Sequence, residues 1–365
     1  MNPALLVFSE DPGATNCLLP LLPHLTEQQI SFRLMADGTA IGMYEKQGYF
    51  AEAVPKEIET LFTNAPPALV VTGTAANPDT HGLRLIDAAR ARTVPTLGVV
   101  DALMNAERRF SGRSNNGLAH LPDWVAVPDR VTAERFISLG TEKDRVIICG
   151  HPHFDAVLTR AQRLRLNDTG IAREKYYPDI DRERKLILFA GEPETHHCRN
   201  SDYLLQGRGG CDGRIAIVME EFLDAVSQLH PRPACVLQLH PRSRIEDLGS
   251  LALEFDKIQQ GGDSLEIMSC VDGVAGLTSM LLTEAALMGR PTLSILPRLE
   301  EKDWLPGIGW GATECLTDRV ALPEALRRLI GNGSGPEVSS RLIRGADRNL
   351  LDLIKRVLQQ NNKTC

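Results

Sequence analysis

The stretch Gly276-Leu-Thr-Ser-Met-Leu-Leu-Thr-Glu-Ala-Ala-Leu-Met-Gly289-Arg-Pro-Thr-Leu-Ser-Ile295 has the pattern of a turn, a short helix and a buried strand. Thr278 or Ser279 can cap the start of the helix, and Gly289 can end it before Pro291. Backbone N–H groups at a capped helix start lack intrahelical partners and point outward at the positive end of the dipole. The stretch therefore predicts a helix with an anion site at its first residues.

Glu284 lies about one turn into this predicted helix, among apolar residues. A carboxylate in such surroundings needs a partner, and the diol of a ribose is a suitable one. The simpler interpretation is an exposed glutamate on an amphipathic helix. The other loops of the chain decide between these two interpretations.

Short apolar runs alternate with helical segments along the whole chain. The predicted strands are 4–8, 31–36, 68–72, 96–100, 124–127, 145–149, 185–190, 234–239, 266–268, 273–275 and 292–296. The predicted helices, besides that of the opening stretch, are 16–27, 38–47, 81–92, 132–139, 215–229, 322–330 and 350–358. Alternation without hairpin signals predicts an α/β protein with parallel sheets and helices on both faces.

A charge-rich stretch, 159–184, separates two series of strands and helices, and we expect it to hold a helix and an interdomain linker. The predicted parts are an N-terminal Rossmann-like acceptor domain (1–158), a C-terminal Rossmann-like nucleotide-binding domain (185–345), and a final helix and tail (346–365). We expect the two sheets to face each other across a cleft lined by the loops that follow their strands. Closure is expected about a hinge near the linker and the final helix.

Composition places the chain among folded globular proteins, with 365 residues, 43% of them hydrophobic and 24% charged. The net charge of −7 weighs against nucleic acid as the main partner. The eight cysteines include no CxxC pair, and no apolar run reaches the ~18 residues of a membrane span. We expect a cytoplasmic protein with reduced thiols, without a leader or a transmembrane segment.

The loops after two strands of the second half add phosphate-binding groups. Gly191 allows the backbone to approach a phosphate closely, His240 can donate to one, and Arg242 offers a bidentate fork. Together with the hydroxyls of the predicted helix start, these residues predict a nucleotide phosphate site that uses neither GxGxxG nor a P-loop. Glu284 would then bind the ribose.

A metal site is the alternative for the loop that begins at Gly191. It contains His196, His197 and Cys198, with Cys211 further along. Their spacing fits no usual zinc signature. We favour a polar insertion loop and expect no metal.

Candidate acid–base residues follow strands of the first half. Glu10 and Asp11 are adjacent after the first strand. Two neighbouring carboxylates suit a general base, because burial and mutual repulsion raise the pKa of one of them. The alternative is an acidic helix start, which the helix dipole stabilises. We favour the dipole interpretation for Glu10 and the base for Asp11. Asp101, after the strand 96–100, is the second candidate base and His81 the third.

Several blocks of this sequence resemble the GT-B glycosyltransferase superfamily, in particular its UDP-GlcNAc 2-epimerase branch. They are the strand that ends at Gly73, the run Val94-Pro-Thr-Leu-Gly-Val-Val-Asp101, the block Ile148-Cys-Gly-His-Pro-His-Phe-Asp155, His240-Pro241, and the opening stretch. The His-Pro and Thr-Ser pairs are also similar to those of bacterial CMP-sugar transferases and of glycerophosphotransferases that use CDP-glycerol. The resemblance implies two Rossmann-like domains and a nucleotide-sugar substrate.

The sequence departs from the epimerase pattern in three places. Asp11-Pro12-Gly13 stands where the epimerases have Arg-Pro-Glu, Thr74 follows Gly73 where they have Asp, and their Ala-Glu-Glu is missing around 118–122. Epimerisation removes and replaces a proton and so needs a full set of acids and bases. Transfer needs a bound nucleotide, a stabilised leaving phosphate and one base.

We therefore expect a metal-independent glycosyltransferase with no cofactor beyond its nucleotide-sugar donor. Asp11 would deprotonate the acceptor, while His240 and Arg242 offset the charge that grows on the leaving group. The alternative is a sugar-nucleotide 2-epimerase, possibly hydrolysing, and the third class is a binding protein with a decayed site. The acceptor, the base and sugar of the donor and the oligomeric state stay open.

Overall fold

A computed structural model describes residues 5–63, 65–75, 77–165, 169–193, 203–210, 213–338 and 342–361. They form two compact units, the first within 1–156 and 342–365 and the second within 157–341. The range predicted as a linker, 159–184, falls in the second unit, and the predicted final helix falls in the first.

The first unit contains a seven-stranded parallel sheet in the order β3-β2-β1-β4-β5-β6-β7. Its strands are β1 (Leu5–Ser9), β2 (Phe32–Ala36), β3 (Glu52–Ala53), β4 (Leu69–Gly73), β5 (Thr96–Val99), β6 (Trp124–Val127) and β7 (Val146–Ile148). Its helices are α1 (Pro12–Leu18), α2 (Leu21–Glu27), α3 (Thr39–Lys46), α4 (His81–Arg90), α5 (Arg130–Ser138), the start of α6 (Pro152–Arg165) and α13 (Ala346–Asn361).

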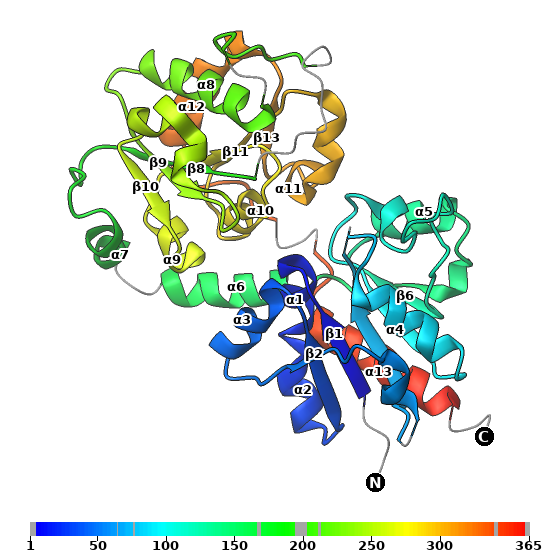
Figure 1. Cartoon of the computed structure of the whole chain (residues 1–365). Coiled ribbons are helices and arrows are strands. Elements are labelled where there is room, and N and C mark those ends of the chain that lie inside the picture. Colours follow the sequence, from blue (N-terminus) through cyan, green and yellow to red (C-terminus); the bar gives the residue numbers. More distant parts are fainter. Residues whose placement is uncertain are drawn as a thin grey trace. The chain divides into compact units, whose positions relative to one another are not determined.

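Strand β1 shows how this sheet packs on both faces. Leu5 and Val7 join an apolar cluster with α1, α2 and α13, whereas Leu6 and Phe8 join another with α4 and the 3₁₀ turn η1 (Ile58–Phe62). Successive side chains point to opposite faces of a strand, so a strand that is buried throughout needs cover on both sides. Figure 1 shows the helices on both faces of the sheet.

The second unit contains a six-stranded parallel sheet in the order β10-β9-β8-β11-β12-β13. Its strands are β8 (Leu186–Ala190), β9 (Ala234–Leu239), β10 (Lys257–Gln260), β11 (Gly273–Gly276), β12 (Thr292–Ile295) and β13 (Glu314–Leu316). Its helices, after the end of α6, are α7 (Thr169–Tyr176), α8 (Arg214–Ser227), α9 (Ser264–Ser269), α10 (Met280–Leu287), α11 (Pro306–Gly309) and α12 (Leu322–Gly331).

One face of the second sheet packs against α8 and α12 in a single apolar cluster. Ile187 and Phe189 of β8 contribute to it, together with Phe222 of α8 and Leu326 of α12. The alternate residue Leu188 is fully buried but points to the opposite face, where α10 packs on β11 and β12. The predicted architecture of two parallel α/β sheets is thus confirmed.

Ten of the eleven predicted strands occur in the structure within a residue or so of their predicted bounds. The eleventh, 266–268, is wrong, because this segment belongs to helix α9. The side chain of Asp263 accepts a hydrogen bond from the Glu266 N–H at 3.1 Å, so an N-cap starts a helix where the apolar pair Ile-Met suggested a strand. Prediction missed the edge strands β3, β10 and β13, which are short or polar.

The predicted helix 16–27 is two helices, α1 and α2, separated at Leu19 and Pro20. Among the described residues, we find no helix with both the length and the apolar character that a membrane crossing requires.

Candidate functional site

Helix α10 follows β11 and precedes β12, as the opening stretch of the sequence predicts. Ser279, not Thr278, is the N-cap, and its hydroxyl accepts a hydrogen bond from the Leu281 N–H at 3.4 Å. Gly289 follows the helix with φ of 77°, a left-handed conformation that favours glycine. The backbone N–H of Thr278 is therefore free of the helix ladder and available to an acceptor.

The loops of Gly191, His240 and Thr278 follow β8, β9 and β11, which are neighbours in the sheet. The Gly191 N–H donates to the Gln238 carbonyl at 2.9 Å. A Cβ added at Gly191 would lie 2.8 Å from that carbonyl oxygen and 3.6 Å from the His240 nitrogen. The backbone at Gly191 therefore packs closely against the neighbouring strand β9, whereas its predicted approach to a phosphate stays a prediction. The three loops meet at the carboxyl edge of the sheet.

Glu192 occupies the anion position at the start of α10. Its Oε1 accepts the Thr278 N–H at 2.5 Å, and both its oxygens lie within 3.3 Å of the Thr278 hydroxyl. Arg214 Nη1 donates to Glu192 Oε2 at 2.9 Å, and Arg214 Nη2 to the Thr278 hydroxyl at 3.1 Å. An amide, a hydroxyl and a guanidinium therefore surround one carboxylate, which is the donor set that a phosphate would need.

Arg214 belongs to a buried network of two guanidinium groups and two carboxylates. Its Nε donates to Glu301 Oε2 at 2.9 Å, its Nη2 also donates to that oxygen, and Arg298 Nε donates to Glu301 Oε1 at 2.7 Å. The side chains of Arg214 and Glu301 are 5% and 0% exposed. Burial by itself lowers the pKa of Arg214, but hydrogen bonds and attraction from Glu301 and Glu192 outweigh it and raise that pKa. Arg214 is a fixed cation.

His240 is half-buried at the end of β9. Its Nδ1 accepts the Arg242 N–H at 3.1 Å. Burial, and then the charge of Arg242, lower the pKa of His240. The neutral ring therefore carries its proton on Nε2, which can donate to a bound phosphate. Arg242 is exposed.

Glu284 is 7% exposed, which excludes the exposed glutamate of an amphipathic helix. Its predicted contact with a ribose stays a prediction. The predicted metal alternative, His196, His197, Cys198 and Cys211, lies outside the described residues. Within the described residues, no group of three or more His, Cys, Asp or Glu side chains is arranged to hold a metal ion.

In the first unit, Asp101 follows β5 and pairs with Arg109, their Oδ1 and Nη1 atoms 3.0 Å apart. Both side chains are largely buried. A Cβ added at Gly13 would lie 2.0 Å from Asp101 Oδ2, so the carboxylate fills the space that the missing side chain leaves. Arg109 Nη1 also approaches the hydroxyl of Thr74 at 3.5 Å. These contacts fix Asp101 in place.

Asp11 and Glu10 differ in their surroundings. Asp11 is the half-buried N-cap residue of α1, but its carboxylate makes no capping hydrogen bond. Glu10 accepts hydrogen bonds from the Asn77 amide at 3.1 Å and from the Thr80 hydroxyl at 2.6 Å. Glu10 therefore ties the loop after β1 to the start of α4. The dipole interpretation that we favoured for it stays a prediction.

His81 opens helix α4, and its Nδ1 lies 3.0 Å from Asp37 Oδ2. Its ring also stands edge-on to Phe8, with centroids 6.4 Å apart. The side chains of His81 and Asp37 are 29% and 50% exposed. A carboxylate that orients one ring nitrogen leaves the other free for proton transfer, which is the geometry of a general base.

His151 is a buried histidine of the first unit that the sequence analysis did not single out. Its Nε2 lies 3.5 Å from Cys17 Sγ, and its ring stacks on Phe154. Burial, and then the neighbouring His153, lower the pKa of His151 to about 3. Burial also raises the pKa of Cys17, so this thiol is a poor nucleophile.

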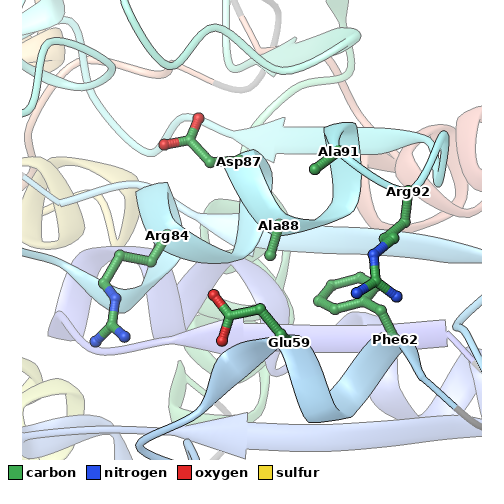
Figure 2. Close-up of a pocket in the computed structure, with 7 residues that line it drawn as sticks. All are labelled: Glu59, Phe62, Arg84, Asp87, Ala88, Ala91 and Arg92. Carbon is green, nitrogen blue, oxygen red and sulfur yellow. The ribbon is translucent and has the colours of Figure 1, made fainter.

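The first unit also contains a pocket. Figure 2 shows it between α4, which contributes Arg84, Asp87 and Ala88, and η1, which contributes Glu59 and Phe62. Among the described residues, none of the predicted site residues lines it.

Prediction missed Glu192, Arg214, Glu301 and Arg298. A signal existed for two of them. Glu192 directly follows the strand-end glycine, and Arg214 opens a helix whose next residues, Ile-Ala-Ile-Val-Met, are apolar. A charged residue within an apolar face indicates a buried partner, but it does not say which one.

No protein-family model and no curated protein matches the sequence. Solved structures do match over almost the whole chain. The UDP-GlcNAc 2-epimerase of Neisseria meningitidis, bound to UDP-GlcNAc, has 16% identity and a TM-score of 0.69, covering 97% of this chain and 99% of its own. The S. aureus MnaA structure with UDP has 15% identity and a TM-score of 0.70, covering 98% and 97%. The wall teichoic acid polymerase TagF has 13% identity and a TM-score of 0.58, covering 99% and 90%.

These matches share the fold of this chain, which is the GT-B fold, and so confirm the predicted resemblance at that level. Two of these structures are of enzymes, an epimerase and a polymerase, and two of the three carry UDP-GlcNAc or UDP. At these identities the likeness does not decide between epimerisation and transfer.

Proposed function

We propose that this chain is a nucleotide-sugar enzyme that transfers the sugar to an acceptor hydroxyl, and that its second unit binds the nucleotide phosphates. The observation that carries the proposal is the donor set of the Thr278 amide, the Thr278 hydroxyl and the Arg214 guanidinium, gathered around a single carboxylate. Like that carboxylate, a phosphate group presents negatively charged oxygens whose lone pairs accept hydrogen bonds. The likeness to structures that hold UDP-GlcNAc and UDP supports a nucleotide as the source of the phosphate.

The remaining groups of the second unit have roles in this proposal. His240, neutral and protonated on Nε2, and Arg242 donate to the phosphate that leaves, where negative charge grows during transfer. Glu284 holds the ribose. No metal is required, because the helix start and the cations supply the positive charge.

In the first unit, we propose Asp11 as the base that takes the acceptor's proton. The acceptor oxygen then forms a bond to the anomeric carbon of the sugar, and the bond from that carbon to the phosphate oxygen breaks. His81 is the competing candidate because Asp37 orients its ring. Variants with Asp11→Asn and His81→Gln distinguish the two, since only loss of the true base lowers kcat by the ~10² to 10⁴-fold typical of general base catalysis.

The first experiment is a thermal-shift screen of the full chain with UDP, CDP, CMP, GDP and dTDP. A ligand that binds only the folded state raises Tm in proportion to its affinity and concentration. We expect at least one nucleotide to raise Tm, and Arg214→Lys to reduce that shift, since lysine cannot reproduce the planar fork. A screen in which every nucleotide leaves Tm unchanged at millimolar concentration would contradict the proposal.

The second candidate is a 2-epimerase of nucleotide sugars. It is favoured by the higher TM-scores of the epimerase matches, 0.69 and 0.70 for two of them against 0.58 for TagF. Proton exchange distinguishes the candidates. Deuterium at sugar C2 after incubation of UDP-GlcNAc in heavy water indicates epimerisation, whereas transfer to an acceptor without exchange indicates a transferase.

A further inference from the structure

The carboxylate of Glu192 stands where the proposed function needs a phosphate. It accepts the Thr278 N–H at 2.5 Å and one guanidinium hydrogen of Arg214 at 2.9 Å. A ligand phosphate and this carboxylate cannot use the Thr278 amide at the same time. The site is thus already filled by a group of the protein itself.

We propose that Glu192 is an internal competitor for the phosphate, which leaves the Thr278 amide when nucleotide binds and so sets the affinity and charge selectivity of the site. This inference rests on the proposed function, because it concerns the same donors. It assigns to Glu192 the part of a specificity-determining residue, and to Arg214 that of a phosphate-binding residue.

The charges of the network explain why Glu192 is the residue that can leave. With Glu192 in place, the guanidinium groups of Arg214 and Arg298 balance the carboxylates of Glu192 and Glu301, and the net charge is zero. Glu301 is fully buried and hydrogen-bonded to both arginines, whereas the Glu192 side chain is 14% exposed. Departure of Glu192 therefore breaks no contact between Glu301 and the arginines, and it leaves one net positive charge for an incoming anion.

Arg214 itself is fixed from several sides and stays in position. Glu301 holds its Nε at 2.9 Å, and its guanidinium lies 5.9 Å from the centre of the Trp304 ring. A cation held in place by a second carboxylate and an aromatic ring keeps its direction when the first carboxylate moves. The Thr278 amide is equally fixed, because it precedes the N-cap of α10.

Isothermal titration of the full chain with UDP and with inorganic pyrophosphate tests the inference. Glu192→Gln removes the charge that competes while keeping the size of the side chain. We expect it to bind both probes at least tenfold more tightly than the wild type does. Glu192→Asp, one methylene shorter, keeps the negative charge but shortens the reach of the carboxylate toward the Thr278 amide, and we expect tighter binding there too. This second variant preserves the charge balance if the first is too unstable to titrate.

Glu300→Gln is the matched control. It removes the same charge close to the network, because Glu300 Oε1 lies 3.8 Å from Arg298 Nε and the Glu300 side chain is 67% exposed. Among the described residues, Glu300 makes no contact with Thr278. We expect its affinities to equal those of the wild type. An equal gain in Glu300→Gln and Glu192→Gln would show a general effect of charge and overturn the inference.

The outcomes separate this inference from the proposed function. Unchanged or weaker binding of both probes by both Glu192 variants, or no binding of either probe by any variant, overturns the inference. Tight UDP binding by the wild type that the variants do not improve leaves the proposed function intact and removes only the competitor. Stronger pyrophosphate binding in the variants, with UDP bound no better than pyrophosphate, supports the competitor and contradicts the nucleotide assignment.

Discussion

Replacing Arg214 with methionine is the sharpest test of the buried network in the second unit. The change removes the cation that pairs with Glu301, which is 0% exposed, and with Glu192, which is 14% exposed. Removal of one partner from a buried ion pair costs about 3–5 kcal/mol, because the other charge stays in a medium of low dielectric. Arg298 still donates to Glu301 at 2.7 Å, so we expect the lower end, about 3 kcal/mol.

Urea denaturation followed by tryptophan fluorescence measures this loss. The chain has three tryptophans, Trp124 in the first unit and Trp304 and Trp310 in the second. A Trp124→Phe background therefore confines the signal to the second unit. An expected loss of about 3 kcal/mol corresponds to roughly a hundredfold rise in the unfolding equilibrium constant.

A double variant checks the physical reason. If the cost comes from an unpaired buried carboxylate, then Arg214→Met combined with Glu301→Met is less destabilised than the sum of the two single variants. Additive effects, or an Arg214→Met protein within about 0.5 kcal/mol of the wild type, would refute the reasoning, since surface substitutions already vary by that much.

Three further perturbations have definite expected outcomes. Gly13→Ala places a methyl group against the Asp101 carboxylate and should cost about 2 kcal/mol by urea denaturation, whereas Gly42→Ala, with open space around it, should cost nothing. His151 has a folded-state pKa of about 3, so as the pH falls the unfolded chain takes up a proton at this residue near pH 6.5, whereas the folded chain does not. The free energy of unfolding should therefore fall by about 2 kcal/mol from pH 6.5 to pH 5. Denaturation at several pH values should show a flatter slope for His151→Gln. Gly191→Ala forces a methyl group to 2.8 Å from a carbonyl oxygen of β9 and should lower the Tm of the second unit, so an unchanged Tm would show that the close approach is not required.

Much of the candidate site could be predicted because its residues follow strands. Gly191, His240 and Thr278 each come directly after or close to the end of an apolar run, and parallel topology brings such positions to one edge. The partners of these residues could not be predicted. Asp101, for example, was expected as a base. Nothing in its local sequence indicates that its carboxylate pairs with Arg109 and fills the space beside Gly13.

The sequence by itself determined the two parallel α/β sheets, since buried strands and capped helices are set by the spacing of apolar residues and by local hydrogen bonds. Where those signals were weak, as in the polar edge strand β10, or ambiguous, as in the helix α9, it missed or misassigned the element. Only the tertiary structure decided which charges meet. Glu192, Arg214 and Glu301 are separated by 22 and 87 positions, and no local pattern encodes a contact between side chains that far apart in the chain. The pairing depends on which loops the sheet order makes neighbours, and on the cost of leaving any one of these charges buried without a partner.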